Sequence, residues 1–192
     1  MMDHFQEENR FLRDKLARLS FSAIQRSGLL ILEAHRWLGI QEIGGNNQGQ
    51  VVGIFQRDAG IAPGDPWCMA FVQYCINHVD ETVAVFNSDA DRSRMAKGAH
   101  CLTVWNKTPE SLKTSTPVPG SIAVWQHSDQ ASGHTGVVVD IPDNGFFRTI
   151  EGNTSPGQGV NRDGDGVFQK DHAITAIGSM RLLGFILPWG NV

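Results

Sequence analysis

Hydrophobic positions in the first part of the chain recur at the spacing of amphipathic helices. Residues 21–38 carry apolar side chains three or four positions apart, and the run stops at Gly39. Residues 48–59 repeat this pattern and stop at Gly60. Glycine readily adopts the left-handed conformation that ends many helices. The pattern therefore predicts two helices, each closed by a glycine.

A third helical run follows a strong start signal. Asp65 is a good N-cap, and Pro66 suits the first helical position. Apolar positions then continue at helical spacing as far as Val79. We therefore expect a helix over residues 66–79, with Cys68 in its first turn.

The next part of the chain is less regular. Residues 81–98 show no sustained period, so we expect an irregular segment with one short helix at 90–96. Residues 101–105 are apolar on one side of a helix, and we interpret Cys101 as a small core residue, the usual role of a free cysteine.

Beyond Thr108 the hydrophobic period changes from helical to extended. Turn residues separate short apolar runs, and a hairpin turn is expected at 142–145. The predicted strands are residues 121–125, 134–140, 146–150, 167–170 and 182–187. Helices followed by an antiparallel sheet predict an α+β fold.

The N-terminal segment has a pattern of its own. Phe5, Leu12 and Leu19 recur every seven residues among charged side chains, which predicts an amphipathic helix. This helix could pack onto its own domain, or it could mediate self-association or bind a partner protein. We therefore divide the chain into an extension at residues 1–20 and a domain at residues 21–192.

Composition and charge narrow the class of protein. A chain of 192 residues with 41% hydrophobic residues can bury a core of its own, and its 21 glycines indicate many turns. Lys and Arg number 16 against 20 Asp and Glu, so the net charge of −4 does not favour nucleic acid or anionic lipid as a partner. We find no membrane span and no secretory signal, so we expect synthesis in the cytoplasm.

Cys68 is the first candidate for chemistry. A helix N-terminus lowers the pKa of a thiol, and the thiolate is the nucleophilic form. The alternative is a buried core cysteine. Cys75 and Cys101 bring the number of cysteines to three without a CxxC spacing, which fits neither a disulfide framework nor a structural zinc site.

A base for this thiol is best supplied by His134. It opens a predicted strand in Gly-His-Thr-Gly, where small neighbours would leave the imidazole accessible, whereas His127 and His172 are interpreted as loop residues. Glu151 lies at the end of the strand expected to pair with it and is the candidate to orient the imidazole. Asn153 could add an amide donor. The alternatives are a solvated strand end for Glu151 and a turn for Glu-Gly-Asn.

Four blocks then occur in order: Asp-Pro-Trp-Cys68-Met-Ala-Phe-Val, Pro-Gly-Ser-Ile-Ala-Val-Trp, Gly-His134-Thr-Gly-Val-Val-Val and Thr-Ile-Glu151-Gly-Asn153-Thr. Together they resemble the CHAP family, the cysteine, histidine-dependent amidohydrolases/peptidases related to NlpC/P60, over residues 28–188. The resemblance implies a papain-like fold with Cys68 as nucleophile and His134 as base. It also implies that Glu151 and Asn153 orient and support the site.

Candidate substrate-binding residues are less specific. The stretch from Ile43 to Gly49 is similar to the entrance segment of bacterial and phage family members. Trp67 and Trp125 could wall a cleft, with the hydrophobic core as the alternative for both. The candidates are Asn46, Asn47, Trp67 and Trp125.

No cofactor is expected, although one calcium-like pattern needs weighing. Asn161, Asp163 and Asp165 mimic the first half of an EF-hand loop, but the twelfth position is His172 rather than a bidentate acid. A hairpin turn rich in Asp and Gly is the favoured interpretation.

The resemblance implies amide hydrolysis in peptidoglycan or its muropeptide fragments. We predict cleavage through a thioester, as an N-acetylmuramoyl-L-alanine amidase or as an endopeptidase of stem or cross-bridge peptides. Without a recognisable secretion signal, we expect the protein to reach the bacterial wall by lysis-coupled release or injection. The alternatives are a non-catalytic, wall-associated phage component and a cysteine amidase that acts on a non-wall amide.

Overall fold

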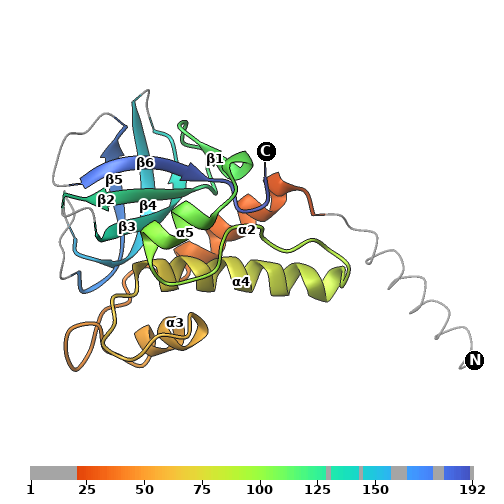
Figure 1. Ribbon diagram of the computed structural model, residues 1–192. Helices are drawn as coiled ribbons and strands as arrows, with labels where there is room; N and C mark the ends of the chain where they lie inside the picture. Colours follow the sequence, from red (N-terminus) through yellow and green to blue (C-terminus); the bar gives the residue numbers. More distant parts are fainter. Residues whose placement is uncertain (1–20, 129–130, 143–144, 157–163, 175–179, 191–192) are drawn as a thin grey trace, which may run out of the picture.

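The computed structural model describes residues 21–128, 131–142, 145–156, 164–174 and 180–190 (Figure 1). The helix predicted for residues 1–20 and the hairpin turn centred on residues 143–144 lie outside the described residues. No helix in the described ranges is both long and apolar enough to cross a lipid bilayer.

The first helix, α2 (Ala23–His35), begins with a capping box. The Ser22 hydroxyl accepts from the backbone amide of Gln25, and the Gln25 side chain accepts from the backbone amide of Ser22. The turns after α2 end at Gly39, whose positive φ explains why the helical pattern stops there. The second predicted helix is α3 (Val52–Asp58), and Gly60 follows it with a positive φ.

The helix α4 (Cys68–Phe86) differs from the sequence prediction at both ends. It begins at Cys68 itself, because Asp65 accepts from the amide of Ala62 and closes a separate turn. It continues past Val79 to Phe86, since Val83 extends the buried face.

The short helix predicted at residues 90–96 is absent, and this segment is irregular. The backbone amide of Arg94 donates to the carbonyl of Pro188 instead of to a helical partner. The remaining helices are α5 (Cys101–Lys107), close to the prediction, and a 3₁₀ turn, η1 (Glu110–Leu112).

Six strands form one antiparallel sheet in the order β1-β6-β2-β3-β4-β5. Strands β2 to β5 form the meander that the turn signals predict, and β6 returns to pair with β2. The short edge strand β1 was not predicted. The strands are β1 (Lys113–Thr114), β2 (Ile122–His127), β3 (Gly133–Asp140), β4 (Phe146–Thr154), β5 (Gly166–Ala173) and β6 (Met180–Ile186).

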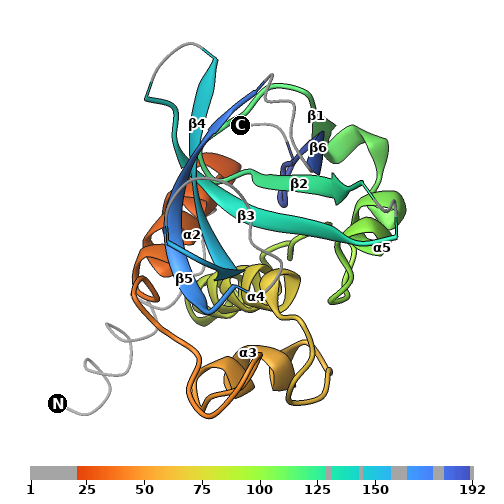
Figure 2. The same ribbon diagram turned by 90° about the vertical axis from the view of Figure 1, so that its left-hand side faces the viewer.

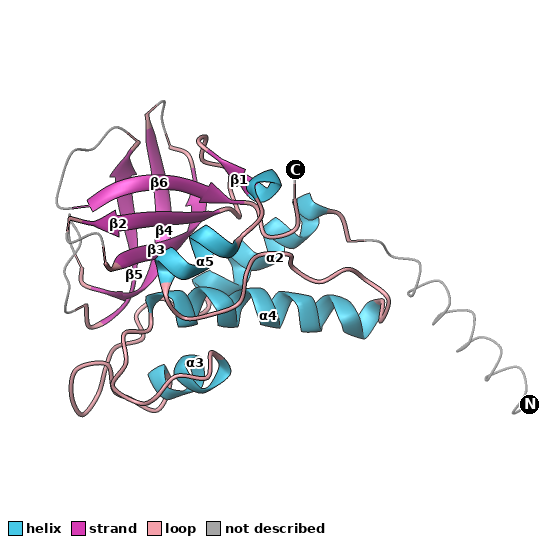
Figure 3. Ribbon diagram, viewed as in Figure 1, coloured by secondary structure: helices cyan, strands magenta, loops and turns pink. Residues whose placement is uncertain are grey.

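The helices cover one face of the sheet, as Figures 1 and 3 show. Helix α4 packs against β3 and β4, α2 packs against α4 and β3, and α3 packs against α4. The main core lies between these layers, and a smaller cluster around Trp125, Phe147 and Phe185 fills the other face. The predicted α+β arrangement is confirmed. Figure 2 shows α4 beneath the sheet, with α3 beyond it.

Candidate active site

Cys68 is the first residue of α4, where free backbone N–H groups concentrate partial positive charge. Trp67 occupies the N-cap position and makes no side-chain capping bond, so no side chain competes for these amides in that way. The Cys68 side chain is buried, with 7% of the residue exposed. This placement agrees with the sequence prediction that Cys68 lies in the first helical turn.

Three groups act on the Cys68 thiol. The thiol of Cys101 lies 3.6 Å from it, sulfur to sulfur, and this hydrogen bond is the largest influence lowering the pKa of Cys68. Burial raises this pKa, whereas the hydrogen bond and charge of His134 and the backbone amide of Met69 lower it further. The pKa of Cys68 therefore lies well below that of an ordinary thiol, which favours the thiolate form.

His134 is the second residue of β3; it hydrogen-bonds Glu151, and Cys68 also acts on its pKa. Burial alone would lower its pKa, but hydrogen bonds with Cys68 and Glu151, together with their charges, raise the pKa to about 10. Its Nε2 lies 2.9 Å from Glu151 Oε2, which leaves Nδ1 as the ring nitrogen available to the thiol. Contrary to the sequence expectation, the small neighbours do not expose the imidazole, which is buried.

Glu151 lies within β4 and is fully buried. Burial would raise the pKa of its carboxyl, but the charge of His134 and hydrogen bonds from His134 and His172 hold it well below its usual range. Gly136 provides the space for this side chain, because a Cβ at that position would come within 2.6 Å of Glu151 Cγ. The second glycine of the Gly-His-Thr-Gly motif, Gly136, therefore accommodates the carboxylate.

Sequence reasoning missed the role of His172, which lies on β5 rather than in a loop. Its Nε2 lies 2.6 Å from Glu151 Oε1, and the Thr149 hydroxyl donates to the same oxygen at 2.6 Å. The ring packs 4.7 Å from the Trp125 ring, centre to centre. Extending the predicted strand 167–170 by three residues would have placed His172 on the sheet. Likewise, His127 is the last residue of β2 and not a loop residue.

Asn153 supports the backbone that precedes the thiol. It adopts a left-handed φ of 54° at the irregularity in β4, so it does not simply continue the alternation from Glu151. With its amide oriented to satisfy its neighbours, it donates to the carbonyl of Gly164 at 2.9 Å and accepts from the backbone amide of Trp67 at 3.2 Å. Asn153 therefore connects β4 to the residue immediately before Cys68.

The four substrate-binding candidates occupy different environments. Trp67 is fully buried against Phe55 and donates to Glu42 Oε1 at 2.8 Å, so it is a core residue and not the wall of an open cleft. Trp125 is also buried, between His134 and His172. Asn47 is buried and its backbone amide donates to Glu42, whereas Asn46 is exposed on the same loop.

No group of three or more His, Cys, Asp or Glu side chains within the described ranges is arranged to hold a metal ion. Of the calcium-like pattern, Asn161 and Asp163 lie outside those ranges, and Asp165 is exposed. His172, its twelfth position, faces Glu151.

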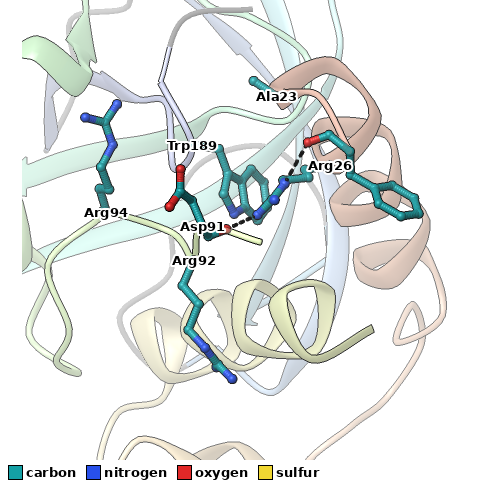
Figure 4. Close-up of a pocket in the computed structure, with 7 residues that line it drawn as sticks. Ala23, Arg26, Asp91, Arg92, Arg94 and Trp189 are labelled. Carbon is teal, nitrogen blue, oxygen red and sulfur yellow. Dashed lines mark hydrogen bonds between the residues drawn. The ribbon is translucent and has the colours of Figure 1, made fainter. Parts of the chain in front are cut away.

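A cavity of about 330 Å³ lies near the start of α2, away from the thiol (Figure 4). Arg26 in its wall donates to the carbonyls of Phe21 and Asp91, so its guanidinium ties backbone segments together. Arg92 and Arg94 also line the cavity, and Figure 4 shows their guanidinium groups directed away from that of Arg26. The charged side chains of this cavity therefore do not converge on one point.

Comparison with known proteins gives one match. Residues 60–153 match the family model described as the CHAP domain. No curated protein and no solved structure matches the chain. The matched segment contains Cys68, His134, Glu151 and Asn153, the residues that carried the predicted resemblance. Residues 60–153 therefore contain a CHAP domain, which confirms the resemblance to that family.

Proposed function

We propose that this protein is a cysteine-dependent hydrolase that cleaves an amide bond of peptidoglycan, with Cys68 as nucleophile. The observation that carries the proposal is the continuous chain from the Cys68 thiolate through His134 to the buried Glu151 carboxylate. CHAP domains are generally hydrolases of amide bonds, which sets the reaction class. A thiolate, an imidazolium and an orienting carboxylate are the groups that such a reaction needs.

The reaction would proceed in two stages. The Cys68 thiolate attacks the amide carbonyl carbon, and the His134 imidazolium gives its proton to the departing amine, which leaves a thioester on Cys68. Neutral His134 then takes a proton from water as that water attacks the thioester. The second stage releases the carboxylic acid and restores the thiolate–imidazolium pair.

Three features would assist these steps. The backbone amide of Cys68 lies at the start of α4, where an oxyanion formed on the carbonyl would meet the positive end of the helix. Asn153 holds the amide of Trp67, one residue before the nucleophile, and so fixes the approach of the chain to this position. Glu151 would orient the imidazole and stabilise its protonated form.

Purified peptidoglycan, digested and analysed by mass spectrometry, tests this function. We expect soluble muropeptides with new amino termini, whose identity distinguishes cleavage after the lactyl group from cleavage within stem or cross-bridge peptides. Cys68→Ala should reduce the rate by at least about 1000-fold.

Cys75→Ala is the matched control, because Cys75 is a buried cysteine of the same helix that lies outside the proposed chain of groups. It should retain most of the activity. Absence of products from the wild-type protein would contradict the proposed substrate, and undiminished turnover by Cys68→Ala would contradict the nucleophile.

A further inference from the structure

The Glu151 carboxylate has a histidine on each of its oxygens. His134 Nε2 lies 2.9 Å from Oε2, and His172 Nε2 lies 2.6 Å from Oε1. A carboxylate only accepts hydrogen bonds, so both rings donate from Nε2. We propose that His172 is a positioning residue, which holds Glu151 so that Oε2 faces His134. This inference rests on the proposed function and deepens it.

The surroundings of His172 suit this role. Its ring packs against two aromatic rings that also stack on each other: Trp125, 4.7 Å away, and Phe147, 5.5 Å away between ring centres. This packing limits the movement of the ring, and a short hydrogen bond then passes the constraint to the carboxylate. Glu151 is fully buried, so a carboxylate oxygen without a hydrogen-bond donor would destabilise the folded protein. If the carboxylate rotated, it would also lose its hydrogen bond from His134.

Charges around Glu151 come from several elements. His134 faces it from β3, and His172 and Lys170 come from β5, while Cys68 of α4 lies beyond His134. Lys170 directs its ammonium to the carbonyl of Ser155 at 3.0 Å. Direct hydrogen bonds to Oε1 come from His172 and from the Thr149 hydroxyl.

Two substitutions separate the hydrogen bond from the packing of the ring. His172→Phe keeps an aromatic ring beside Trp125 but removes the donor, whereas His172→Gln restores an N–H group. For His172→Phe we expect kcat to fall about 10- to 100-fold with little change in KM. The acid limb of Cys68 alkylation by iodoacetamide should move to higher pH, because Glu151 would protonate more readily. His172→Gln should reverse much of both effects.

Phe147→Leu is the matched control, because it loosens the same aromatic stack without removing a hydrogen bond from Glu151. An unchanged alkylation profile in folded His172→Phe would overturn the proposal, and so would an equal shift in Phe147→Leu. If His172→Phe does not fold, His172→Asn, whose amide is too short to reach Glu151, takes its place. Alkylation needs no wall substrate, so it tests this role even if peptidoglycan is not cleaved.

The contact between Cys68 and Cys101 supports a second, independent inference. Their sulfur atoms are 3.6 Å apart, and both residues are buried. A disulfide needs an approach to about 2.0 Å, which is a short movement for two side chains already in contact. We infer that Cys101 is the resolving cysteine for an oxidised Cys68, so that a hydroperoxide reversibly inactivates the site.

The chemistry balances with hydrogen peroxide as oxidant. The Cys68 thiolate attacks one peroxide oxygen, the O–O bond breaks, and hydroxide leaves, so Cys68 becomes a sulfenic acid. The Cys101 sulfur then attacks the Cys68 sulfur, forms the S–S bond and displaces the oxygen, which takes the thiol proton and leaves as water. A dithiol reductant supplies the two electrons that restore both thiols.

Peptide mapping without reduction tests this step. Wild-type protein treated with peroxide should contain a Cys68–Cys101 cross-link, lose iodoacetamide reactivity at Cys68, and regain it with dithiothreitol. Cys101→Ser should form no cross-link and should accumulate sulfinic Cys68 that dithiothreitol does not restore. Cys75→Ser, the matched control, should behave like the wild type.

Three outcomes would overturn the inference: a sulfinic Cys68 with free Cys101 in the wild type, a cross-link to Cys75, or no oxidation of Cys68. All are read from masses, so none depends on whether peptidoglycan is the substrate.

Discussion

At the scale of single residues, the pKa values of Cys68 and His134 move in opposite directions. Hydrogen bonds with Cys101 and His134 lower the pKa of Cys68 well below the ordinary thiol value. Hydrogen bonds with Cys68 and Glu151, and their charges, raise the pKa of His134 to about 10. Each charge stabilises the other in a buried site. Between the two pKa values both groups are ionised, which is the state that the proposed attack requires.

This pairing predicts selective alkylation near pH 6. Cys68 should react with iodoacetamide at least about 10-fold faster than the other two cysteines. The pKa of Cys75 is raised by burial and by the charge of Glu33, and that of Cys101 is raised by its hydrogen bond to Cys68 and by burial. Peptide masses after partial labelling measure the three rates. Equal labelling would contradict the depressed pKa of Cys68.

Glu151→Gln tests the carboxylate at the same scale. A neutral amide cannot stabilise the His134 imidazolium as a carboxylate does, and its NH₂ group would face a histidine N–H. We expect turnover to fall at least about 10-fold and Cys68 alkylation near pH 6 to slow. Glu33→Gln is the control, because Glu33 is another buried carboxylate, which accepts hydrogen bonds from Trp37 and Arg36. Its turnover and its rate of Cys68 alkylation should stay close to those of the wild type.

At the scale of elements, the site depends on how closely β4 approaches α4. A Cβ at Gly152 would lie 2.7 Å from Phe71 Cβ and 2.7 Å from a ring atom of Trp67. Gly152→Ala should therefore push β4 from the start of α4, lower the free energy of unfolding by about 1–3 kcal/mol, and reduce Cys68 reactivity. Gly28 lies within α2, and a Cβ there would meet no neighbouring atom. Gly28→Ala should therefore stabilise the protein by up to about 1 kcal/mol, because alanine favours the helix more than glycine does. Urea denaturation of the two variants measures the contrast.

Elements also show what could be predicted from sequence. Helical and alternating periods placed α2, α4 and the meander, because these patterns record which face of an element is buried. The predicted end of α4 at Val79 was wrong. The helix continues to Phe86, since Val83 extends its buried face. The roles of Cys101 and His172 depend on contacts between α4 and α5 and between β4 and β5. Spacing within one element contains no information about such contacts.

At the scale of the whole molecule, the ion pair links the site to folding. His134, with a raised pKa, contributes stability below about pH 6.5 that is lost as pH rises toward 10. Cys68, with a lowered pKa, contributes stability above about pH 8.5 that is lost as pH falls. Between about pH 6.5 and 8.5 the pair binds one proton in both states, on His134 in the folded protein and on Cys68 in the unfolded chain. We therefore expect the contribution of these two groups to stability to be constant over this range.

Cys68→Ala should move the upper edge of this plateau. Without the thiolate, His134 remains protonated beside Glu151 in the folded protein but loses its proton above about pH 6.5 in the unfolded chain. Stability should then decline from about pH 6.5 instead of about 8.5. Urea midpoints measured from about pH 5 to 10 reveal the edge, and Cys75→Ala should keep it in place. If the Cys68→Ala edge stayed near 8.5, folded Cys68 and His134 could not share their proton as a thiolate–imidazolium pair.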